Sequence, residues 1–489
     1  MLRKSSICMA IAAALTCQQA FAEGYKLFEQ SVSSMGNAYA GRGAQITDAT
    51  LVYSNPAALT QLQGAQLSGG INYIAARTNY RNAEAYSAQG APVVGRSEGK
   101  ISLNELIPFV FYSDHISEQL SWGIGFYVPY GLSSDYQQDW VGRYFADETA
   151  IEVLSLQPTL AYKVTDIFSV GLGISVNRVS GTLSKFKDHS GLCEMGTAIN
   201  DLAGGADIYN DAYCNSHYQV EGDDIAFGYT LGLHSEPVSG TRLALVYHSA
   251  VRYTLKGDSE ITNTPITGAN VAGNPGYMVI APHLPAVDLS TGKLAANDYL
   301  TEASKLSLTT PATLTFSIDQ QVTPELSLQF SANWTEWSEF RSIDIVSDDA
   351  NPSISLNTQL PQNLNAEGYI GYIPEQWRNV WAFAVGATYQ YRPDLALKAG
   401  IAYDENPIQD SHRTARVPTT DRTWLTVGSN WKLAENMSMD FAYGYLFTSD
   451  TAINEHEYNV QNVALYNSNL KADYSNKAQV VAVQFNYTF

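Results

Sequence analysis

The side chains most often used in catalysis are scattered along this chain and form no recognisable site. None of the eight histidines stands in an H-E-x-x-H metal motif, and the sequence contains no G-x-S-x-G nucleophile elbow and no P-loop. His234 and His248 are expected on neighbouring strands, but at different distances from the turn between them, so their rings should not face each other. The sequence therefore predicts no enzyme, no metal site and no cofactor.

Asp404 and Arg422 are the charged residues that most strongly suggest a buried pair. Arg422 has the opposite parity to Leu425 and Val427, so in a strand it points to the face that those apolar residues avoid. Asp404 ends the preceding strand pattern and lies within reach of a pairing contact. The pair can brace a wall of strands or contact a ligand.

The N-terminus has the features of an export signal. Arg3 and Lys4 precede an apolar run, and Ala20-Phe21-Ala22 offers an A-x-A cleavage site, so residues 1–22 are predicted to be a signal peptide. A lipoprotein signal, with Cys17 as the acylated residue, is the alternative.

The predicted mature chain is strongly acidic and keeps two cysteines. Loss of Arg3 and Lys4 lowers the formal net charge from −20 to −22, and such a chain repels the phosphates of nucleic acid. Cys193 and Cys214 lie in one long polar segment of an exported protein, where a disulfide is the expected state.

The elements that position these residues are strands. After residue 22 no run of about 18 apolar residues occurs, so helical membrane spans are not expected. The C-terminal stretch alternates strictly, with polar Gln484, Asn486 and Thr488 between apolar neighbours. The apolar positions of that stretch are Val481, Val483, Phe485, Tyr487 and Phe489. This pattern recurs through the chain and is the outward-apolar, inward-polar code of a membrane barrel.

The lengths of the connections distinguish a membrane barrel from a soluble sandwich. Short turns alternate with long segments, and six short turns plus seven long loops join 14 antiparallel strands. The short turns lie near residues 116, 165–166, 237–240, 323–325, 392–394 and 434–436, and the long loops near 81–99, 131–149, 181–221, 257–309, 345–377, 405–421 and 448–476. The sequence therefore predicts an all-β, 14-stranded antiparallel transmembrane β-barrel over residues 65–489.

Residues 23–64 precede the first strand and follow a different pattern. Asn55 and Pro56 predict an N-cap and first position of a short helix, which Ala57 continues. A solvated tail does not need this helix or the apolar residues before it. We expect residues 23–64 to form a hatch of short helices that plugs the barrel lumen.

Five stretches stand out in order along the chain: GNAYAGRGAQITDATLVYSNPAAL, which contains Asn55-Pro56-Ala57, then PYGLSSDY, TEWSEF, IAYDENP and DRTWLTVGSNW. Together they resemble the family of FadL-type long-chain fatty-acid transporters, which also contains aromatic-hydrocarbon transporters. The resemblance implies capture of hydrophobic molecules outside the cell, a lumenal binding pocket, and lateral release beside a kinked third strand.

The third strand supports such a kink independently of the resemblance. Its apolar face runs from Leu120 to Val128, and the residues Pro129-Tyr130-Gly131 follow. Pro129 has no N–H to donate to a neighbouring strand, and Gly131 allows the backbone to bend. Pro108 and Pro158 interrupt the strands on either side. We therefore predict a lateral opening at residues 129–131, although prolines tolerated near loops would leave the same pattern.

The chain differs from the family that it resembles at positions that are expected to lie near the head group of the ligand. Ser180 and Asp344 occupy positions where the family's best-known member carries cations. Arg178 and Arg341 lie two or three residues away and are candidate substitutes, with Asp404 and Arg422, although each arginine can equally be an ordinary ion-pair partner.

The sequence thus predicts a monomeric passive transporter of the bacterial outer membrane, for long-chain fatty acids or similar hydrophobic molecules. Its other expected partners are outer-membrane lipid and lipopolysaccharide. Uptake of aromatic hydrocarbons, a general polar porin, and a surface adhesion or phage-receptor role remain alternatives.

Overall fold

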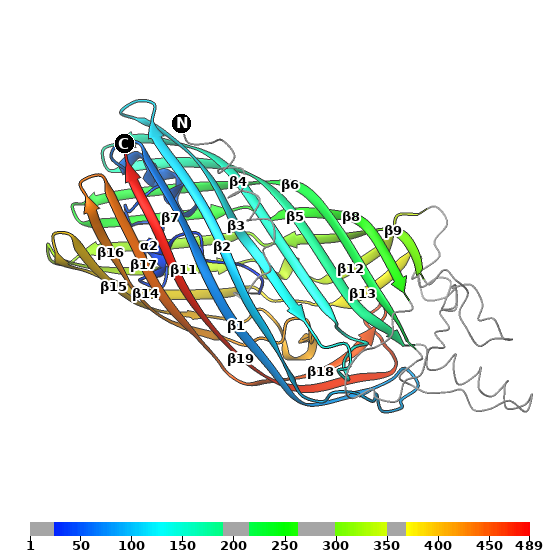
Figure 1. The fold of residues 1–489 in the computed structure, drawn as a ribbon. Helices are drawn as coiled ribbons and strands as arrows, with labels where there is room; N and C mark the ends of the chain where they lie inside the picture. Colours follow the sequence, from blue (N-terminus) through cyan, green and yellow to red (C-terminus); the bar gives the residue numbers. More distant parts are fainter. Residues whose placement is uncertain (1–23, 189–214, 263–298, 350–367) are drawn as a thin grey trace, which may run out of the picture.

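The computed structural model describes residues 24–188, 215–262, 299–349 and 368–489, which form one closed sheet (Figure 1). Antiparallel pairing of the first and last strands closes the sheet, from Gln66↔Thr488 to Tyr86↔Asn469. The strand segments are β1 (Gln66–Tyr86), β2 (Gly99–His115), β3 (Leu120–Asp135), β4 (Glu148–Thr165), β5 (Phe168–Asp188), β6 (Asn215–Val238), β7 (Thr241–His248), β8 (Val251–Thr262), β9 (Tyr299–Thr310), β10 (Thr313–Gln321), β11 (Leu326–Thr335), β12 (Ser342–Ser347), β13 (Tyr369–Pro374), β14 (Val380–Arg392), β15 (Leu395–Asp404), β16 (Arg422–Ala434), β17 (Met437–Thr448), β18 (Thr451–Tyr458) and β19 (Ala464–Thr488).

These segments make up the 14 antiparallel wall strands that the sequence predicts. Five wall strands are interrupted, so that β7 and β8, β9 and β10, β11 and β12, β13 and β14, and β17 and β18 are each two parts of one strand. Pro311 separates β9 from β10, since proline cannot donate to the ladder. A 3-10 turn, η4 (Trp337–Glu339), separates β11 from β12.

The two faces of the wall differ in polarity as the alternating pattern predicts. Phe227 and Val385 on the outer face are 70% and 54% exposed, whereas Gln157, Ser169 and Gln484 on the inner face are fully buried. Apolar side chains that face outward are stable in lipid, and inward polar groups find partners in the lumen.

The connections alternate as predicted, but several strands run further than expected. The short turns and the C-terminus lie together at one end, where the N–H of Phe489 donates to the carbonyl of Ala65 (Figure 1). The predicted loop 448–476 is instead mostly the hairpin of β18 and β19. The apolar alternation ends before the strands do, because the pairing of β5 and β6 continues with polar residues facing outward, such as Glu221 and Asp223.

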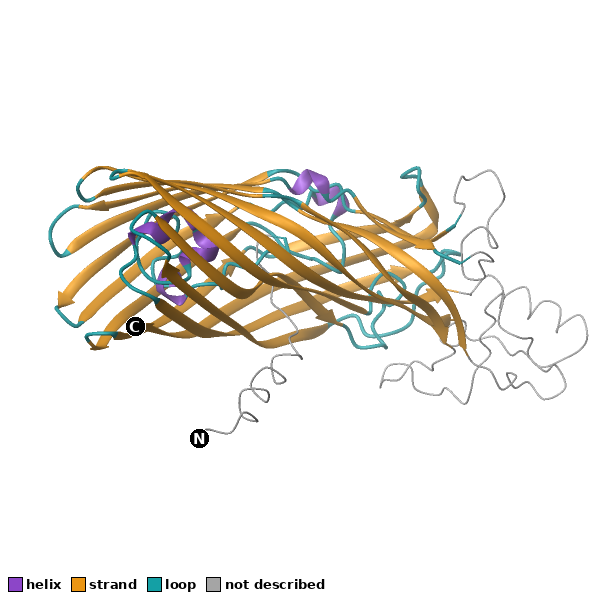
Figure 2. Ribbon diagram, turned by 90° about the horizontal axis from the view of Figure 1, so that it is seen from above, coloured by secondary structure: helices purple, strands orange, loops and turns teal. Residues whose placement is uncertain are grey.

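The segment before β1 is folded inside the barrel near the C-terminal end (Figure 2). It contains α2 (Val32–Met35), α3 (Leu51–Ser54) and the 3-10 helix η1 (Pro56–Gln61). A further 3-10 turn, η6 (Asp410–His412), lies between β15 and β16. In the described residues, helices are too short and too polar to cross a membrane.

Candidate functional site: a lumenal pocket beside a gap in the barrel wall

The hatch is held to the wall by the Asn55-Pro56-Ala57 element. The Asn55 side chain caps η1 by accepting from the N–H of Ala57 at 3.1 Å, and Pro56 takes the first helical position. The Asn55 amide also donates to the carbonyls of Gly43 at 2.7 Å and Leu233 at 3.1 Å. One side chain therefore orders the helix, the preceding loop and the contact with β6.

Glycines in the wall let the hatch backbone approach closely. A Cβ at Gly171 on β5 would collide with the backbone of Pro56 and Ala57, and one at Gly400 on β15 would collide with the backbone of Asn37. On the latter side the Lys398 ammonium donates to the carbonyl of Ser33 at 2.7 Å. These glycines thus allow close contact between the hatch and the wall on two sides of the barrel.

The wall itself is incomplete between β2 and β3. Their pairing runs only from Val110↔Phe126 to His115↔Ser121, although both strands continue beyond Val110 and Phe126. The register between β3 and β4 shifts between Tyr127 and Tyr130, the position of Pro129. Simple alternation predicts Val128 on the outer face, but the shift in register leaves it buried in the core.

The start of the hatch replaces β2 as the partner of β3 at this gap. We call residues 24–31 the strap. The N–H of Leu27 donates to the carbonyl of Pro129 at 2.9 Å, and the N–H of Gly131 donates to the carbonyl of Tyr25 at 2.7 Å. Backbone groups near lipid need such partners. The predicted residues Pro129, Tyr130 and Gly131 therefore lie at the edge of the gap.

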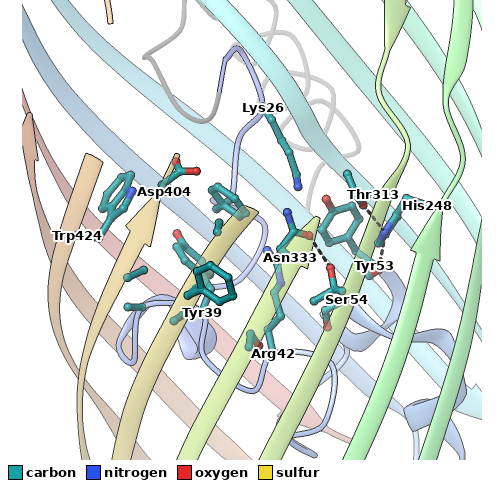
Figure 3. Close-up of a pocket in the computed structure, with 18 residues that line it drawn as sticks. Lys26, Tyr39, Arg42, Tyr53, Ser54, His248, Thr313, Asn333, Asp404 and Trp424 are labelled. Atoms are coloured by element: carbon teal, nitrogen blue, oxygen red, sulfur yellow. Dashed lines mark hydrogen bonds between the residues drawn. The ribbon is translucent and has the colours of Figure 1, made fainter. Parts of the chain in front are cut away.

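A pocket lies in the lumen between the hatch and the wall, with an empty volume of about 670 Å³ that includes space open to the surroundings (Figure 3). The hatch contributes Lys26, Phe28, Ala38, Tyr39, Arg42, Tyr53 and Ser54. The wall contributes His248, Thr313, Thr315, Ser331, Asn333, Ala382, Phe383, Ala384, Ala402, Asp404 and Trp424.

Two cations from the hatch lie among the aromatic rings of this pocket. The Arg42 guanidinium is 5.2 Å from the ring of Tyr53 and 5.4 Å from that of Tyr39, and the Arg42 residue is only 8% exposed. The Lys26 ammonium is 4.9 Å from the ring of Phe28. Figure 3 shows both side chains reaching into the pocket. The Arg42 guanidinium also donates to Oε1 of Gln30 at 3.2 Å. A buried cation among rings favours an anionic ligand group beside it.

A hatch carboxylate lies close enough to influence these cations. Burial raises the pKa of Glu29, while the N–H of Phe28, which donates to Oε2 at 2.7 Å, and the charges of Arg42 and Arg422 act in the opposite direction. Glu29 therefore carries negative charge less readily than an exposed glutamate, and it offsets Arg42 only in part.

The structure brings Asp404 and Arg422 together and places both inside the barrel. They are directly opposite each other in the register of β15 and β16, and both are buried. Asp404 lines the pocket. The pair thus occupies the lumenal position that parity predicts.

The structure does not bring Arg178 or Arg341 to the pocket. Arg178 lies on the outer face, where its Nε is 3.8 Å from a carboxylate oxygen of Asp223 and both side chains are 58% exposed. It shares the outward parity of Leu172 and Ile174. Arg341 is exposed just after η4. Cys193 and Cys214 lie outside the described residues.

The sequence analysis did not single out the cations Lys26 and Arg42, and it did not place His248 at the pocket. The His248 ring donates from Nε2 to the Tyr53 carbonyl at 3.2 Å and lies against the Tyr53 ring. As the sequence predicts, His248 does not face His234, because its partner in the register of β6 and β7 is Thr230. The signal in the sequence is only that a lysine and an arginine stand among aromatic residues of a predicted internal plug. Within the described ranges, no three His, Cys, Asp or Glu residues form a group that could hold a metal ion.

A family model described as outer membrane protein transport protein (OMPP1/FadL/TodX) matches residues 13–489. The chain belongs to this family. It is 26% identical to the long-chain fatty acid transport protein of Escherichia coli K12, covering 98% of both chains. A FadL homologue of Pseudomonas aeruginosa superimposes with a TM-score of 0.77 at 25% identity, covering 95% of this chain and all of that one. The Pseudomonas putida toluene transporter TodX, at 16% identity and a TM-score of 0.63 over 95% and 99% of the chains, shares the fold.

This OMPP1/FadL/TodX family member is therefore a bacterial outer-membrane β-barrel that transports hydrophobic compounds. The family comprises transporters and channels, which agrees with the scattered distribution of catalytic residue types in the sequence.

Proposed function

We propose that this protein is a passive transporter of long-chain fatty acids, whose carboxylate binds at Lys26 and Arg42. The observation that carries the proposal is the presence of these two cations inside an aromatic pocket that the hatch and the wall build together. The E. coli relative named a long-chain fatty acid transport protein supports the same substrate class.

The apolar walls and the cations have different tasks in this proposal. Burial of about 16 methylenes at about 0.8 kcal/mol each gives an upper limit near 13 kcal/mol. A hydrogen bond to a charged group contributes about 1.5–3 kcal/mol. Apolar surface therefore sets most of the affinity, whereas Arg42 and Lys26 orient the ligand and select molecules with an acidic head group.

The proposed exit is lateral, through the wall between β2 and β3. The docked hatch fills the lumen toward the end that carries the short turns, so a ligand either moves the hatch or leaves sideways (Figure 2). The shortened β2–β3 ladder, with the strap bonded to Pro129 and Gly131, supports the sideways path. An apolar ligand gains nothing from entering the aqueous periplasm first.

Uptake of radiolabelled oleate by cells that lack their own fatty-acid transporter tests the proposal. Arg42→Gln should lower the affinity for oleate by about tenfold or more, because a charge-assisted bond is lost. Arg178→Gln is the matched control, since it removes an arginine from the outer face, and uptake should not change. Normal uptake by a surface-expressed Arg42→Gln variant would overturn the head-group assignment.

Uptake of aromatic hydrocarbons is the second candidate function, because Phe28, Tyr39, Tyr53 and Trp424 line the pocket. A hydrocarbon has no carboxylate, so Arg42→Gln should leave its uptake unchanged. Competition between toluene and oleate in the same cells separates the two substrates.

The remaining partners are also proposals. The β1–β19 seam closes the lumen within one chain, which supports a monomer. Polar outward residues beyond the apolar belt, such as Arg178 and Lys256, suit contact with lipopolysaccharide. An adhesion or phage-receptor role would depend largely on loops outside the described residues.

A further inference from the structure

A row of four aromatic rings connects the lumenal pocket to the gap between β2 and β3. Tyr53, which lines the pocket, lies 4.7 Å from Tyr127 between ring centroids. The Tyr127 ring stacks on Phe111 at 5.7 Å and an interplanar angle of 19°, and Phe111 lies 5.8 Å from Phe109. Phe109 and Phe111 are on β2, and Tyr127 is on β3.

Tyr127 occupies the point at which the wall stops being paired. Phe126, its neighbour, is the last β3 residue in the register with β2, and the register with β4 shifts just after Tyr127. Its ring is buried among core residues from the hatch and both strands. The ring therefore lies between the pocket residue Tyr53 and the end of the β2–β3 pairing.

The Tyr127 ring is held in place from the hatch side. Its hydroxyl donates to Oε1 of Gln157 at 2.6 Å, and the Gln157 amide donates to the carbonyl of Val52 at 2.7 Å. Gly125 makes room for the row, because a Cβ there would collide with the Phe111 ring. The position of the ring is therefore tied to a hatch segment, α3, that also carries the pocket residue Tyr53.

We infer that Tyr127 is the gate between the lumenal pocket and the gap in the wall. This inference rests on the proposed lateral release of a fatty acid. The ring closes the path at rest, and a rotation that breaks the Gln157 bond and the two ring contacts opens it. These contacts are few and uncharged, so the gate opens without unfolding the barrel or undocking the hatch.

A gate differs from a binding residue in what it changes. Removing a gate speeds entry and exit by the same factor and leaves the dissociation constant unchanged, whereas removing a binding contact changes the dissociation constant mainly through the exit rate. The test uses the purified full-length protein in lipid vesicles with anthroyloxy-labelled palmitate as the probe, and stopped-flow fluorescence measures both rate constants.

The gate predicts that Tyr127→Ala raises both rate constants by about fivefold or more while the dissociation constant stays within about twofold. Tyr127→Phe, which removes only the hydroxyl, should raise both rates by a smaller factor. Tyr218→Phe and Tyr218→Ala are matched controls, because Tyr218 is a buried tyrosine on β6 whose hydroxyl bonds to Ser259 at 3.0 Å and which belongs to a different core cluster from this row. They should leave both rates unchanged.

Unchanged rate constants in Tyr127→Phe and Tyr127→Ala, or a changed dissociation constant with an unchanged entry rate, would overturn the gate. Because Tyr127→Phe keeps the ring, it answers the question even where Tyr127→Ala does not fold. Failure of the unmodified, folded protein to bind the probe would instead overturn the proposed function, and the gate with it.

Discussion

The β2–β3 and β5–β6 boundaries are both in contact with the hatch, but one is open and the other is sealed. Every residue of β5 pairs with β6, from Phe168↔Ser235 to Asp188↔Asn215, without a shift in register. The β2–β3 register ends at Val110↔Phe126. At the sealed boundary, glycines let the hatch backbone touch the wall, whereas at the open one a proline breaks the ladder and the strap takes the free bonds. In the proposed mechanism the ligand passes at the β2–β3 boundary, whereas the close backbone docking of the hatch at β5 and β6 belongs to the fully paired one.

Straightening β3 should remove most of the difference between the two boundaries. Pro129→Ala plus Gly131→Val restores a ladder donor and a side chain that favours strand structure, so β2 can compete with the strap for β3. Oleate uptake should fall about tenfold or more, equal to about 1.4 kcal/mol or more in the barrier. Uptake at the unmodified level, with normal surface expression, would show that the kink is not needed.

Crowding the sealed boundary should release the hatch. Gly171→Leu forces a side chain into the backbone of Pro56 and Ala57, and such overpacking costs about 1–3 kcal/mol. We expect ion conductance in planar bilayers to rise. Gly69→Ala is the control, because its Cβ would meet only a backbone oxygen at 3.9 Å. An ion conductance of the Gly171→Leu variant no higher than that of the unmodified protein would contradict the docking role of this glycine.

A change in the hatch should strengthen ligand binding in the pocket without altering the β2–β3 or the β5–β6 boundary. Glu29→Gln removes a carboxyl group whose charge partly offsets Arg42. Burial raises the pKa of Glu29 in the folded protein, so ionisation of Glu29 destabilises the fold as the pH rises from the unfolded-state pKa through the folded-state pKa. Without this carboxylate beside Arg42, the variant should bind oleate a few-fold more tightly near neutral pH, as measured by titration. The gain should be smaller at acid pH, where Glu29 of the unmodified protein is protonated.

Regular parts of the barrel could be predicted from the sequence because their periodicity is local. Alternation around Gln484 reveals the C-terminal strand, and Asn55 followed by Pro56 reveals the helix start, because each signal involves only neighbouring residues. Parity alone also places Arg178 with Leu172 and Ile174 on the outer face, away from the lumen where a ligand residue would lie.

The pocket cations could not be placed in the same way. Lys26 and Arg42 belong to a hatch with only short helical turns, so their directions are set by docking against the wall and not by a repeating pattern. Likewise, Pro129 marks a break in β3, but the strap that takes its carbonyl lies about a hundred residues earlier in the chain. Such pairings depend on the assembled barrel.

Locking the hatch to the wall tests the central claim, that the ligand leaves through the wall, most directly. A Cβ at Gly43 in the hatch would lie 3.4 Å from the Cβ of Ala244 on β7, close to the separation of about 3.5–4.5 Å in disulfides. Gly43→Cys plus Ala244→Cys should form this bond under oxidation, and each single variant controls for reductant effects. We expect the locked protein to take up oleate at the unmodified rate. Uptake that stops on oxidation and returns on reduction in the double variant alone would show that the ligand passes the hatch.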